Sequence, residues 1–477
     1  MKKILFIVCL FAIWNLQSCD NYLDIKPKGY TIPEYYDDFL LLMNGLPLYT
    51  TSDPLVNYLT DNTLLGDKDG LEEIALQSKN EAIQNLYCFA SGAIYLPGQA
   101  DRFYESSYKN IFTYNVVINN IMAVSDANEN PKLQLYGEAL MGRAMEYLNL
   151  VNGYARHFNS KTAATDLGVP LVLSEDINGS YTRKTVLEVY ECIEKDVLEA
   201  MSGFSDKTVD VFHANLVVGQ AFLARMYLYM GDYNKAMANA KEVLKVHQNL
   251  LDLKKFISTE GGWDHIKDAE GNIFPNNGEN PEDFFYRLDA TDLSAELCAS
   301  QDLIDCYQRD LPMGAIDQRL ALFFFKDRAN IWKPMEFPGK YLWAAFHTQN
   351  VGFTVPEMIL IAAECEARVG SKENAVTYIN QLRDYRIVNN QKLSANDKDE
   401  ALKLVLDERR REMPFTGMTR YIDLKRLNLE ERFQKAVIHK ADGQTWTLPA
   451  NDVRYVLPIP PSVLEFNPDI PQYERSL

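Results

Sequence analysis

Apolar residues recur at every third or fourth position along much of this chain, which is the period of an α-helix with one buried face. The pattern is clearest over residues 216–246, where it stops at Gly231 and resumes after Tyr233. Two helices joined by a tight turn explain the interruption, because glycine accepts the backbone conformation of such a turn. The pattern therefore predicts a helical hairpin over these residues.

The positions at which the two helices would touch carry small and aromatic side chains: Ala224, Tyr227, Gly231, Tyr233, Ala236 and Ala240. This spacing is typical of a tetratricopeptide (TPR) repeat, a helical hairpin that stacks on its neighbours. Ala363, Gly370 and Ala375 repeat the separations found at Ala224, Gly231 and Ala236. A third hairpin would be split, with a helix through residues 144–147 pairing across a long loop with a helix over 185–201. The sequence thus predicts a mostly α-helical fold with TPR-like packing.

Two stretches between the hairpins have a different character. Residues 46–99 and 260–350 are rich in glycine, proline, asparagine, aspartate and aromatic residues. Such stretches are typical of long, structured loops on a rigid scaffold. We therefore expect these insertions to carry the binding face.

The N-terminus has the order of a secretory leader. Two lysines precede an apolar run over residues 4–14 that is too short to span a bilayer, and Leu16-Gln17-Ser18-Cys19 follows. The last four residues resemble a lipobox, in which the thiol of the new first residue is lipidated before cleavage. We therefore predict a signal peptide over residues 1–18 and a lipid anchor on Cys19. The alternative is an ordinary secretory leader with an incidental cysteine.

Charge and cysteine usage narrow the partners. The chain has a net charge of −18, and loss of Lys2 and Lys3 with the leader brings it to −20. A balance this negative argues against nucleic acid or anionic lipid as a partner. Five irregularly spaced cysteines follow Cys19, without a metal-ligand array: Cys88, Cys192, Cys298, Cys306 and Cys365. Buried free thiols are the expected state, with a bond between Cys298 and Cys306 as the alternative.

Signatures of catalysis are missing from the sequence. It contains no nucleophile elbow, zinc-protease helix, phosphate-binding loop or dinucleotide-binding turn. Asp67-Lys68-Asp69-Gly70 lacks the remaining ligands of a calcium loop, so we expect a solvated turn. Glu408-Arg-Arg-Arg-Glu412 favours an ion-paired structural helix over an anion site. We predict a protein that is not an enzyme and holds no metal or other cofactor, although a carboxylate pair of a glycoside hydrolase remains an open alternative.

Several motifs together resemble the SusD/RagB family of outer-membrane lipoproteins, which capture nutrients at the cell surface. The resemblance covers almost the whole chain and rests on these segments: Cys19-Asp-Asn-Tyr-Leu-Asp-Ile-Lys-Pro27, Arg143-Ala-Met-Glu-Tyr147, Thr182-Arg-Lys-Thr-Val186, Glu357-Met-Ile-Leu-Ile-Ala-Ala-Glu364-Cys-Glu-Ala-Arg368, Glu408-Arg-Arg-Arg-Glu412, Asp423-Leu-Lys-Arg426, Leu457-Pro-Ile-Pro460 and Asn467-Pro468.

The resemblance implies about four TPR-like hairpins that support a variable face, in one compact unit with an N-terminal half over residues 19–250 and a C-terminal half over 251–477. It also implies a lid on a SusC-like TonB-dependent transporter, facing outward from the outer membrane. Family members bind glycans or, less often, peptides. A lipid-anchored hydrolase and a TPR adaptor that binds only proteins are the remaining hypotheses.

A glycan site needs aromatic platforms beside amide, carboxylate or guanidinium groups, because sugars offer apolar C–H faces and rings of hydroxyls. Three stretches of the sequence offer such residues. The expected ligand-binding residues are Tyr95, Gln99, Asp101 and Arg102 in one loop, Trp332, Tyr341 and Trp343 in a second stretch, and Trp263 in a glycine-flanked loop.

Replacing Cys19 by alanine should release the protein from membranes and leave ligand binding intact, because only the lipid tether is lost. Membrane fractionation and a binding assay on the variant measure the two properties. Continued membrane attachment of the variant would contradict lipidation at Cys19.

Overall fold

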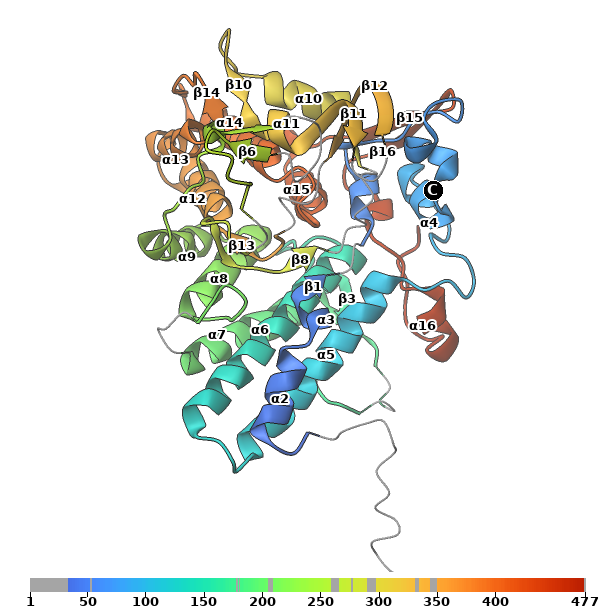
Figure 1. The fold of residues 1–477 in the computed structure, drawn as a ribbon. Helices are drawn as coiled ribbons and strands as arrows, with labels where there is room; N and C mark the ends of the chain where they lie inside the picture. The colour runs from blue at the N-terminus through green and yellow to red at the C-terminus, as the bar shows by residue number, and fades with distance from the viewer. Residues whose placement is uncertain are drawn as a thin grey trace, which may run out of the picture.

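Helices dominate the structure, a computed structural model that describes residues 33–51, 54–176, 179, 181–204, 209–258, 266–275, 278–289, 297–330, 334–343 and 350–475. Helical hairpins follow one another through the molecule, and strands β6, β10, β11 and β12 lie with α10 and α11 on the side away from α6 and α7 (Figure 1). Strand β8 lies apart from them in Figure 1, paired with β1 close to α6. The prediction of a mostly α-helical, TPR-like scaffold is confirmed.

The hairpin predicted from residues 216–246 forms as expected, from α8 (Leu216–Met230) and α9 (Tyr233–Val246). Gly231 ends α8 with a φ of 77°, in the left-handed region that glycine enters without strain. The second predicted hairpin also forms, from α12 (Val355–Val369) and α13 (Lys372–Asp384). Helix α9 packs on α12, so the two hairpins stack.

The split hairpin is formed by α6 (Glu129–Tyr154) and α7 (Val186–Gly203), which pack together across the loop that contains β3 (Leu167–Pro170) and β4 (Arg183–Thr185). On its other side α6 packs against α5 (Arg102–Asn120). A Cβ on Gly142 would lie 2.2 Å from the Tyr114 ring, so this crossing requires glycine.

A buried arginine holds these three helices together. Arg143 of α6 pairs with Asp196 of α7 at 2.8 Å and donates to Asn115 of α5 at 2.8 Å. Its side chain is only 7% exposed. The positive charge of the guanidinium is neutralised by Asp196, and its N–H groups donate hydrogen bonds to both partners. This explains why the Arg143-Ala-Met-Glu-Tyr147 segment has an arginine on a face that is otherwise apolar.

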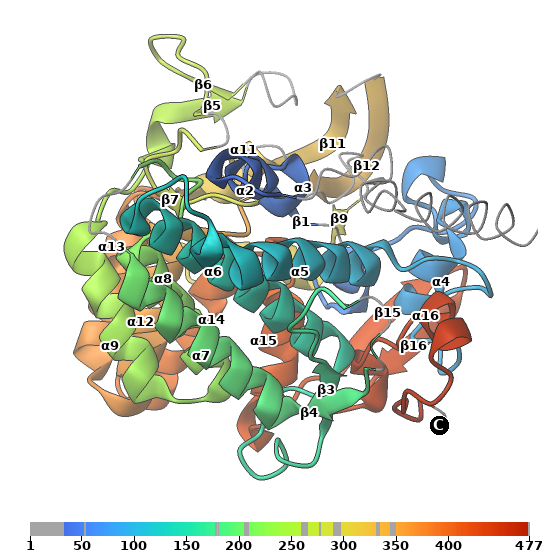
Figure 2. The same ribbon diagram turned by 90° about the horizontal axis from the view of Figure 1, so that it is seen from below.

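The remaining helices are short or lie toward the C-terminus: α2 (Tyr36–Met43), α3 (Leu46–Tyr49), α4 (Glu81–Tyr87), α10 (Gln301–Gln308), α11 (Gln318–Phe323), α14 (Lys398–Glu412), α15 (Thr419–Leu427) and α16 (Pro461–Phe466). Figure 2 shows α14 and α15 behind the helical layer, with α4 and α16 at one end of the molecule. Helix α14 packs on both α12 and α13.

Strands pair in small sheets. One sheet has four strands in the order β11 (Phe324–Asn330), β12 (Pro334–Trp343), β9 (Cys298–Ala299) and β2 (Thr63–Leu64). The two-stranded pairs are β1 (Thr50–Thr51) with β8 (Leu288–Asp289), β5 (Phe256–Ser258) with β6 (Ile266–Asp268), β7 (Asp283–Phe285) with β13 (Phe353–Thr354), β10 (Ile316–Asp317) with β14 (Ile387–Val388), β15 (Val437–Ala441) with β16 (Gln444–Leu448), and β3 with β4.

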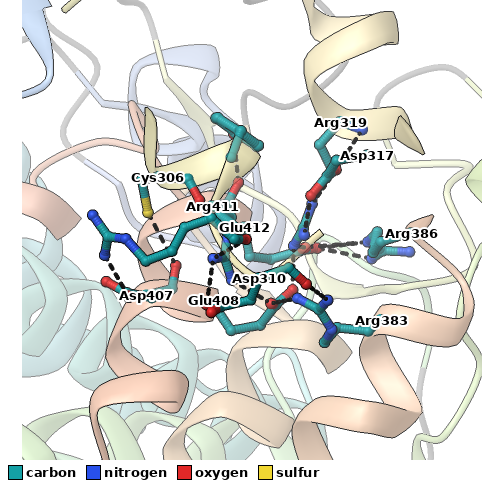
Figure 3. Close-up of polar contacts among 12 residues, drawn as sticks. Cys306, Asp310, Asp317, Arg319, Arg383, Arg386, Asp407, Glu408, Arg411 and Glu412 are labelled. Atoms are coloured by element: carbon teal, nitrogen blue, oxygen red, sulfur yellow. Dashed lines mark hydrogen bonds and ion pairs between the residues drawn. The ribbon is translucent and has the colours of Figure 1, made fainter. Parts of the chain in front are cut away.

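The arginine-rich end of α14 is an ion-paired structural element, as the sequence predicted. Glu408 is fully buried and accepts hydrogen bonds from Arg383 at 3.1 Å and Arg411 at 3.0 Å (Figure 3). A third arginine, Arg319, lies 2.7 Å from its other oxygen. Burial alone raises the pKa of Glu408, but the three guanidinium groups outweigh it and lower that pKa to about 2.

A second buried network joins α14 to α15 and α12. Arg409 of α14 and Arg426 of α15 share Asp423, at 2.9 and 2.7 Å. Arg426 also pairs with Glu364 of α12 at 2.6 Å. Lys425, on the same helix as Arg426, donates to backbone carbonyls at the end of α6, including that of Ala155 at 2.8 Å. These contacts tie the helices of the N-terminal half to those of the C-terminal half.

The cysteines beyond Cys19 are free, and Cys298, Cys306 and Cys365 are buried. The expectation of buried thiols is therefore confirmed for these three, and Cys298 and Cys306 do not pair. Asp67 to Gly70 forms an exposed turn, also as expected. Among the described residues, no helix combines the length and apolar character needed to cross a bilayer.

Replacing Glu408 by glutamine should lower the free energy of unfolding by about 3 to 5 kcal/mol, because it leaves buried arginines without their counter-charge. Urea unfolding followed by circular dichroism measures the change. Glu191→Gln is the matched control, since Glu191 is an exposed glutamate on α7 and should change little. Equal stability of the two variants would contradict a structural role for the Glu408 network.

Candidate functional site

The predicted loop before α5 puts two of its four candidate residues in the core. Tyr95 is 5% exposed and belongs to the main hydrophobic cluster. Asp101 is 2% exposed and begins α5 by accepting hydrogen bonds from the backbone of Phe103 at 3.1 Å and Tyr104 at 3.2 Å. Burial raises the pKa of Asp101. Both side chains thus support the fold, and neither offers an open face to a ligand.

The other two residues of this loop are accessible. Gln99 is half-buried, and its Oε1 accepts the Leu96 N–H at 3.0 Å, which closes the loop on itself. Arg102 is exposed at the first position of α5. The loop therefore presents polar groups without the aromatic platform that the sequence suggested.

The second predicted stretch is divided between surface and interior. Tyr341 is half-buried on β12, and the Lys326 ammonium lies 5.7 Å from its ring centroid. Trp343 is 5% exposed and packs against Phe324 and Phe415, with ring centroids 4.9 and 5.5 Å away. Trp263, Trp332 and Cys19 lie outside the described residues.

Trp343 forms part of the wall of a cavity of about 130 Å³ at the centre of the molecule. Helices α6, α8 and α12, the residues around β7 and β8, and the turn before α15 all contribute to this central cavity. Its walls include the aromatic rings of Phe103, Tyr229, Tyr286 and Trp343 and the polar side chains of Asn149, Arg225, Asp283, Asn350 and Glu357.

Most of the charged groups that line the central cavity form ion pairs. Arg225 of α8 forms an ion pair with Glu357 of α12 at 2.6 Å. Arg386 pairs with Glu282 at 2.7 Å and with Glu412 at 2.8 Å. The walls therefore contain many charged side chains. The charges of the two arginines and three glutamates just named are compensated by ion pairs within the protein.

Asn350 fixes the part of the wall that contains Asp283. Its amide donates to Asp283 at 2.8 Å and accepts from the backbone N–H groups of Arg287 and Gly352 at 3.1 and 2.8 Å. Burial raises the pKa of Asp283 to about 7, although the bond from Asn350 opposes the shift.

Next to the central cavity, three aromatic rings form a row. The rings of Tyr49 and Phe212 meet edge to face at 5.9 Å, and those of Phe212 and Tyr286 do so at 5.8 Å. Phe212 is 38% exposed and Tyr49 is half-buried, whereas Tyr286 is 5% exposed and lines the cavity. We call Tyr49, Phe212 and Tyr286 the aromatic row.

Backbone pairing brings these three residues together from distant parts of the chain. Strand β1, directly after Tyr49, runs parallel to β8, with Thr50 opposite Leu288. The Tyr286 N–H donates to the Val211 carbonyl at 2.7 Å. Asp210 accepts the Phe212 N–H at 2.7 Å, which fixes the turn that carries Phe212.

Arg287 lies beside the aromatic row and is held rigidly. Its guanidinium stacks over Tyr49 and Phe285, 4.8 and 4.0 Å from the ring centroids. It also donates to the backbone carbonyl of Phe212 at 3.0 Å. Beneath it, burial raises the pKa of Glu146 to about 7, although the bond from Asn110 and the charge of Arg287 oppose the shift.

Sequence patterns contained only a partial signal for this site. Tyr49 and Tyr286 lie in the two insertions that were expected to carry the binding face. Phe212 lies in neither, and no other Phe, Tyr or Trp lies within four residues of it. Only the pairing of β1 with β8 and the contact of Tyr286 with Val211 create the row, so residue spacing could not reveal it.

Comparison with known proteins identifies two family models in the chain. The model described as "Starch-binding associating with outer membrane" matches residues 68–228, and the model of the SusD family matches residues 353–475. A curated relative, SusD-like protein P2 of Formosa agariphila, is 24% identical over 90% of each chain.

Solved structures share the fold. A SusD superfamily protein from Bacteroides thetaiotaomicron superposes with a TM-score of 0.69 at 22% identity, covering 92% of this chain and 99% of the other. A laminarin-binding SusD-like protein superposes with a TM-score of 0.59 at 17% identity, covering 91% and 98%. At these identities the likeness establishes the fold.

Glu146 should make stability depend on pH. Its folded pKa of about 7 exceeds the ordinary value of 4.5, so its contribution is full below pH 4.5 and is lost as the pH rises through about 7. Glu146→Gln should therefore flatten the fall in unfolding free energy across this window, as measured by urea unfolding at several pH values. An unchanged pH profile, equal to that of Glu191→Gln, would contradict the buried-carboxyl account.

Proposed function

Because the chain belongs to the SusD/RagB family, we propose that it captures glycans at the cell surface, without catalysis, and delivers them to a SusC-like TonB-dependent transporter. The family is associated with the outer membrane and includes proteins described as starch-binding and laminarin-binding. The lipid anchor on Cys19 and the outward orientation belong to the same proposal.

The observation that carries the proposal is the aromatic row beside Arg287. Sugar rings present C–H faces that stack on aromatic side chains, and their hydroxyls bond to polar groups at the edges. Phe212 and Tyr49 offer partly exposed rings, and Asp210 and His213 lie in the same turn as Phe212. The row continues inward to Tyr286, so an extended ligand meets several rings in succession.

The ion pairs of three cavity glutamates support binding without catalysis. Hydrolysis of a glycosidic bond requires two carboxyl groups that are free to act as acid and as base or nucleophile. In the central cavity, Glu357 is committed to Arg225, while Glu282 and Glu412 are committed to Arg386. No group of three or more potential metal ligands gathers among the described residues.

A peptide ligand is the second candidate, because aromatic rings also receive apolar side chains of peptides. The two ligand classes differ in the polar contacts they need. A peptide presents few hydroxyls, whereas a glycan presents them along its whole length. Binding to peptides with none to glycans would favour this second candidate.

Replacing Phe212 or Tyr49 by alanine should weaken glycan binding up to about tenfold each, since an aromatic contact contributes about 0.5 to 1.5 kcal/mol beyond its buried area. Isothermal titration calorimetry against a panel of plant, host and microbial glycans, laminarin included, measures the effect. Phe466→Ala is the control, because Phe466 is 85% exposed on α16 and belongs to neither the row nor the cavity.

Three results would count against the proposal. Unchanged affinity in both row variants would remove the aromatic row from the binding site. Release of reducing sugar by the purified protein, abolished by one carboxylate substitution, would show a hydrolase. Co-purification with a transporter without any small ligand would favour a protein adaptor.

A further inference from the structure

The aromatic row and the central cavity share one residue. Tyr286 meets Phe212 edge to face at 5.8 Å on one side and lines the cavity on the other. Thr51, two residues after Tyr49, and Asp283, three before Tyr286, also line the cavity. The aromatic row and the central cavity therefore adjoin at Tyr286.

The charges of the cavity walls select against an anionic ligand. Besides Arg225 and Arg386, two further arginines of the wall have carboxylate partners. Arg319 pairs with Asp317 at 2.6 Å and Arg411 with Glu408 at 3.0 Å. An anionic group on the ligand would enter without an unpaired arginine to receive it, which is unfavourable in a buried site.

The walls also contain uncharged polar groups. The Tyr286 hydroxyl is buried and has no hydrogen-bond partner among the described residues. Asn149 and Tyr229, whose side chains carry an amide and a hydroxyl, also line the cavity. Amides and hydroxyls are the partners that sugar hydroxyls use, and an unpaired buried hydroxyl favours a ligand that satisfies it.

The size of the cavity limits what can enter. Its volume of about 130 Å³ is well below the roughly 300 to 1,000 Å³ of clefts that bury drug-sized ligands. It has room for a single ring and not for a folded or continuing chain. Trp343 and Tyr229 supply aromatic surface in its walls.

We infer that the central cavity binds the terminal, uncharged sugar residue of a glycan whose following residues lie along the aromatic row. The protein then recognises chain ends of neutral glycans and not chain interiors. This inference rests on the proposed function. It adds that the protein binds the end of the glycan chain and that the glycan it binds is uncharged.

Tyr286→Phe is the sharpest variant, because it removes only a hydroxyl that has no partner within the protein. It should weaken binding of laminarihexaose or maltohexaose about two- to tenfold, the loss of one hydrogen bond, while the melting temperature stays equal or rises. Tyr385→Phe, at a tyrosine that does not line the cavity, is the matched control. A purely structural hydroxyl would leave the affinity of Tyr286→Phe unchanged, which would overturn the inference.

Filling the cavity provides an independent test. Thr416 lines it, whereas Thr377 is exposed on α13. Thr416→Phe should abolish tight binding of either hexasaccharide, and Thr377→Phe should not. Thermal melting verifies that both variants are folded.

The length of the glycan distinguishes a protein that binds glycan chain ends from one that binds glycan chain interiors. Calorimetry with laminarin fractions of increasing length should give a constant number of protein molecules per glycan chain. A number that rises in proportion to length, or preferential binding of uronate or sulfated glycans, would overturn the inference. Loss of binding in the Phe212 and Tyr49 variants, with none in the cavity variants, would overturn it while leaving the proposed function intact.

Discussion

The rest of the structure depends on the neutralisation of the arginines buried at the end of α14. Arg409, Arg410 and Arg411 are consecutive, and none is more than 6% exposed. Buried guanidinium groups require carboxylates in contact, because desolvation of an unpaired charge is prohibitive. The partners come from the whole chain: Asp61, Asp302, Asp310, Glu408 and Asp423.

This requirement also shapes the central cavity. Arg319, Arg386, Arg411 and Glu412 belong to the network of α14 and also line the cavity. The wall is therefore polar but offers no spare charge from these groups, a combination suited to an uncharged polyol. The same ion pairs that hold α11, α13 and α14 together thus determine which ligand chemistry fits between them.

Local sequence patterns predicted the scaffold well. The turn at Gly231 and the helices on either side of it follow from the spacing of apolar residues and from the position of the glycine. Both are properties of short segments. The glutamates interleaved with the arginines of α14 likewise indicated ion pairing. That pairing proved to be buried and long-range, and no local pattern identified Arg319 or Arg383 as the partners of Glu408.

The ligand-facing residues were harder to predict, because burial of an aromatic side chain is decided by segments far away in sequence. Trp343 was expected as a platform, and Phe324 and Phe415 enclose it from two other elements. Tyr95 and Asp101 are similarly taken into the core and a helix cap. Phe212 had no local signal, and the row it joins exists only because three distant segments meet.

A crystal structure of the protein with a bound neutral hexasaccharide, such as laminarihexaose or whichever glucan binds most tightly, tests the central claim most directly. The account predicts sugar rings against Phe212 and Tyr49, and one terminal ring inside the central cavity within hydrogen-bonding distance of the Tyr286 hydroxyl. A glycan bound elsewhere, for example over Tyr341 and Arg102, with the cavity and the aromatic row untouched, would contradict it.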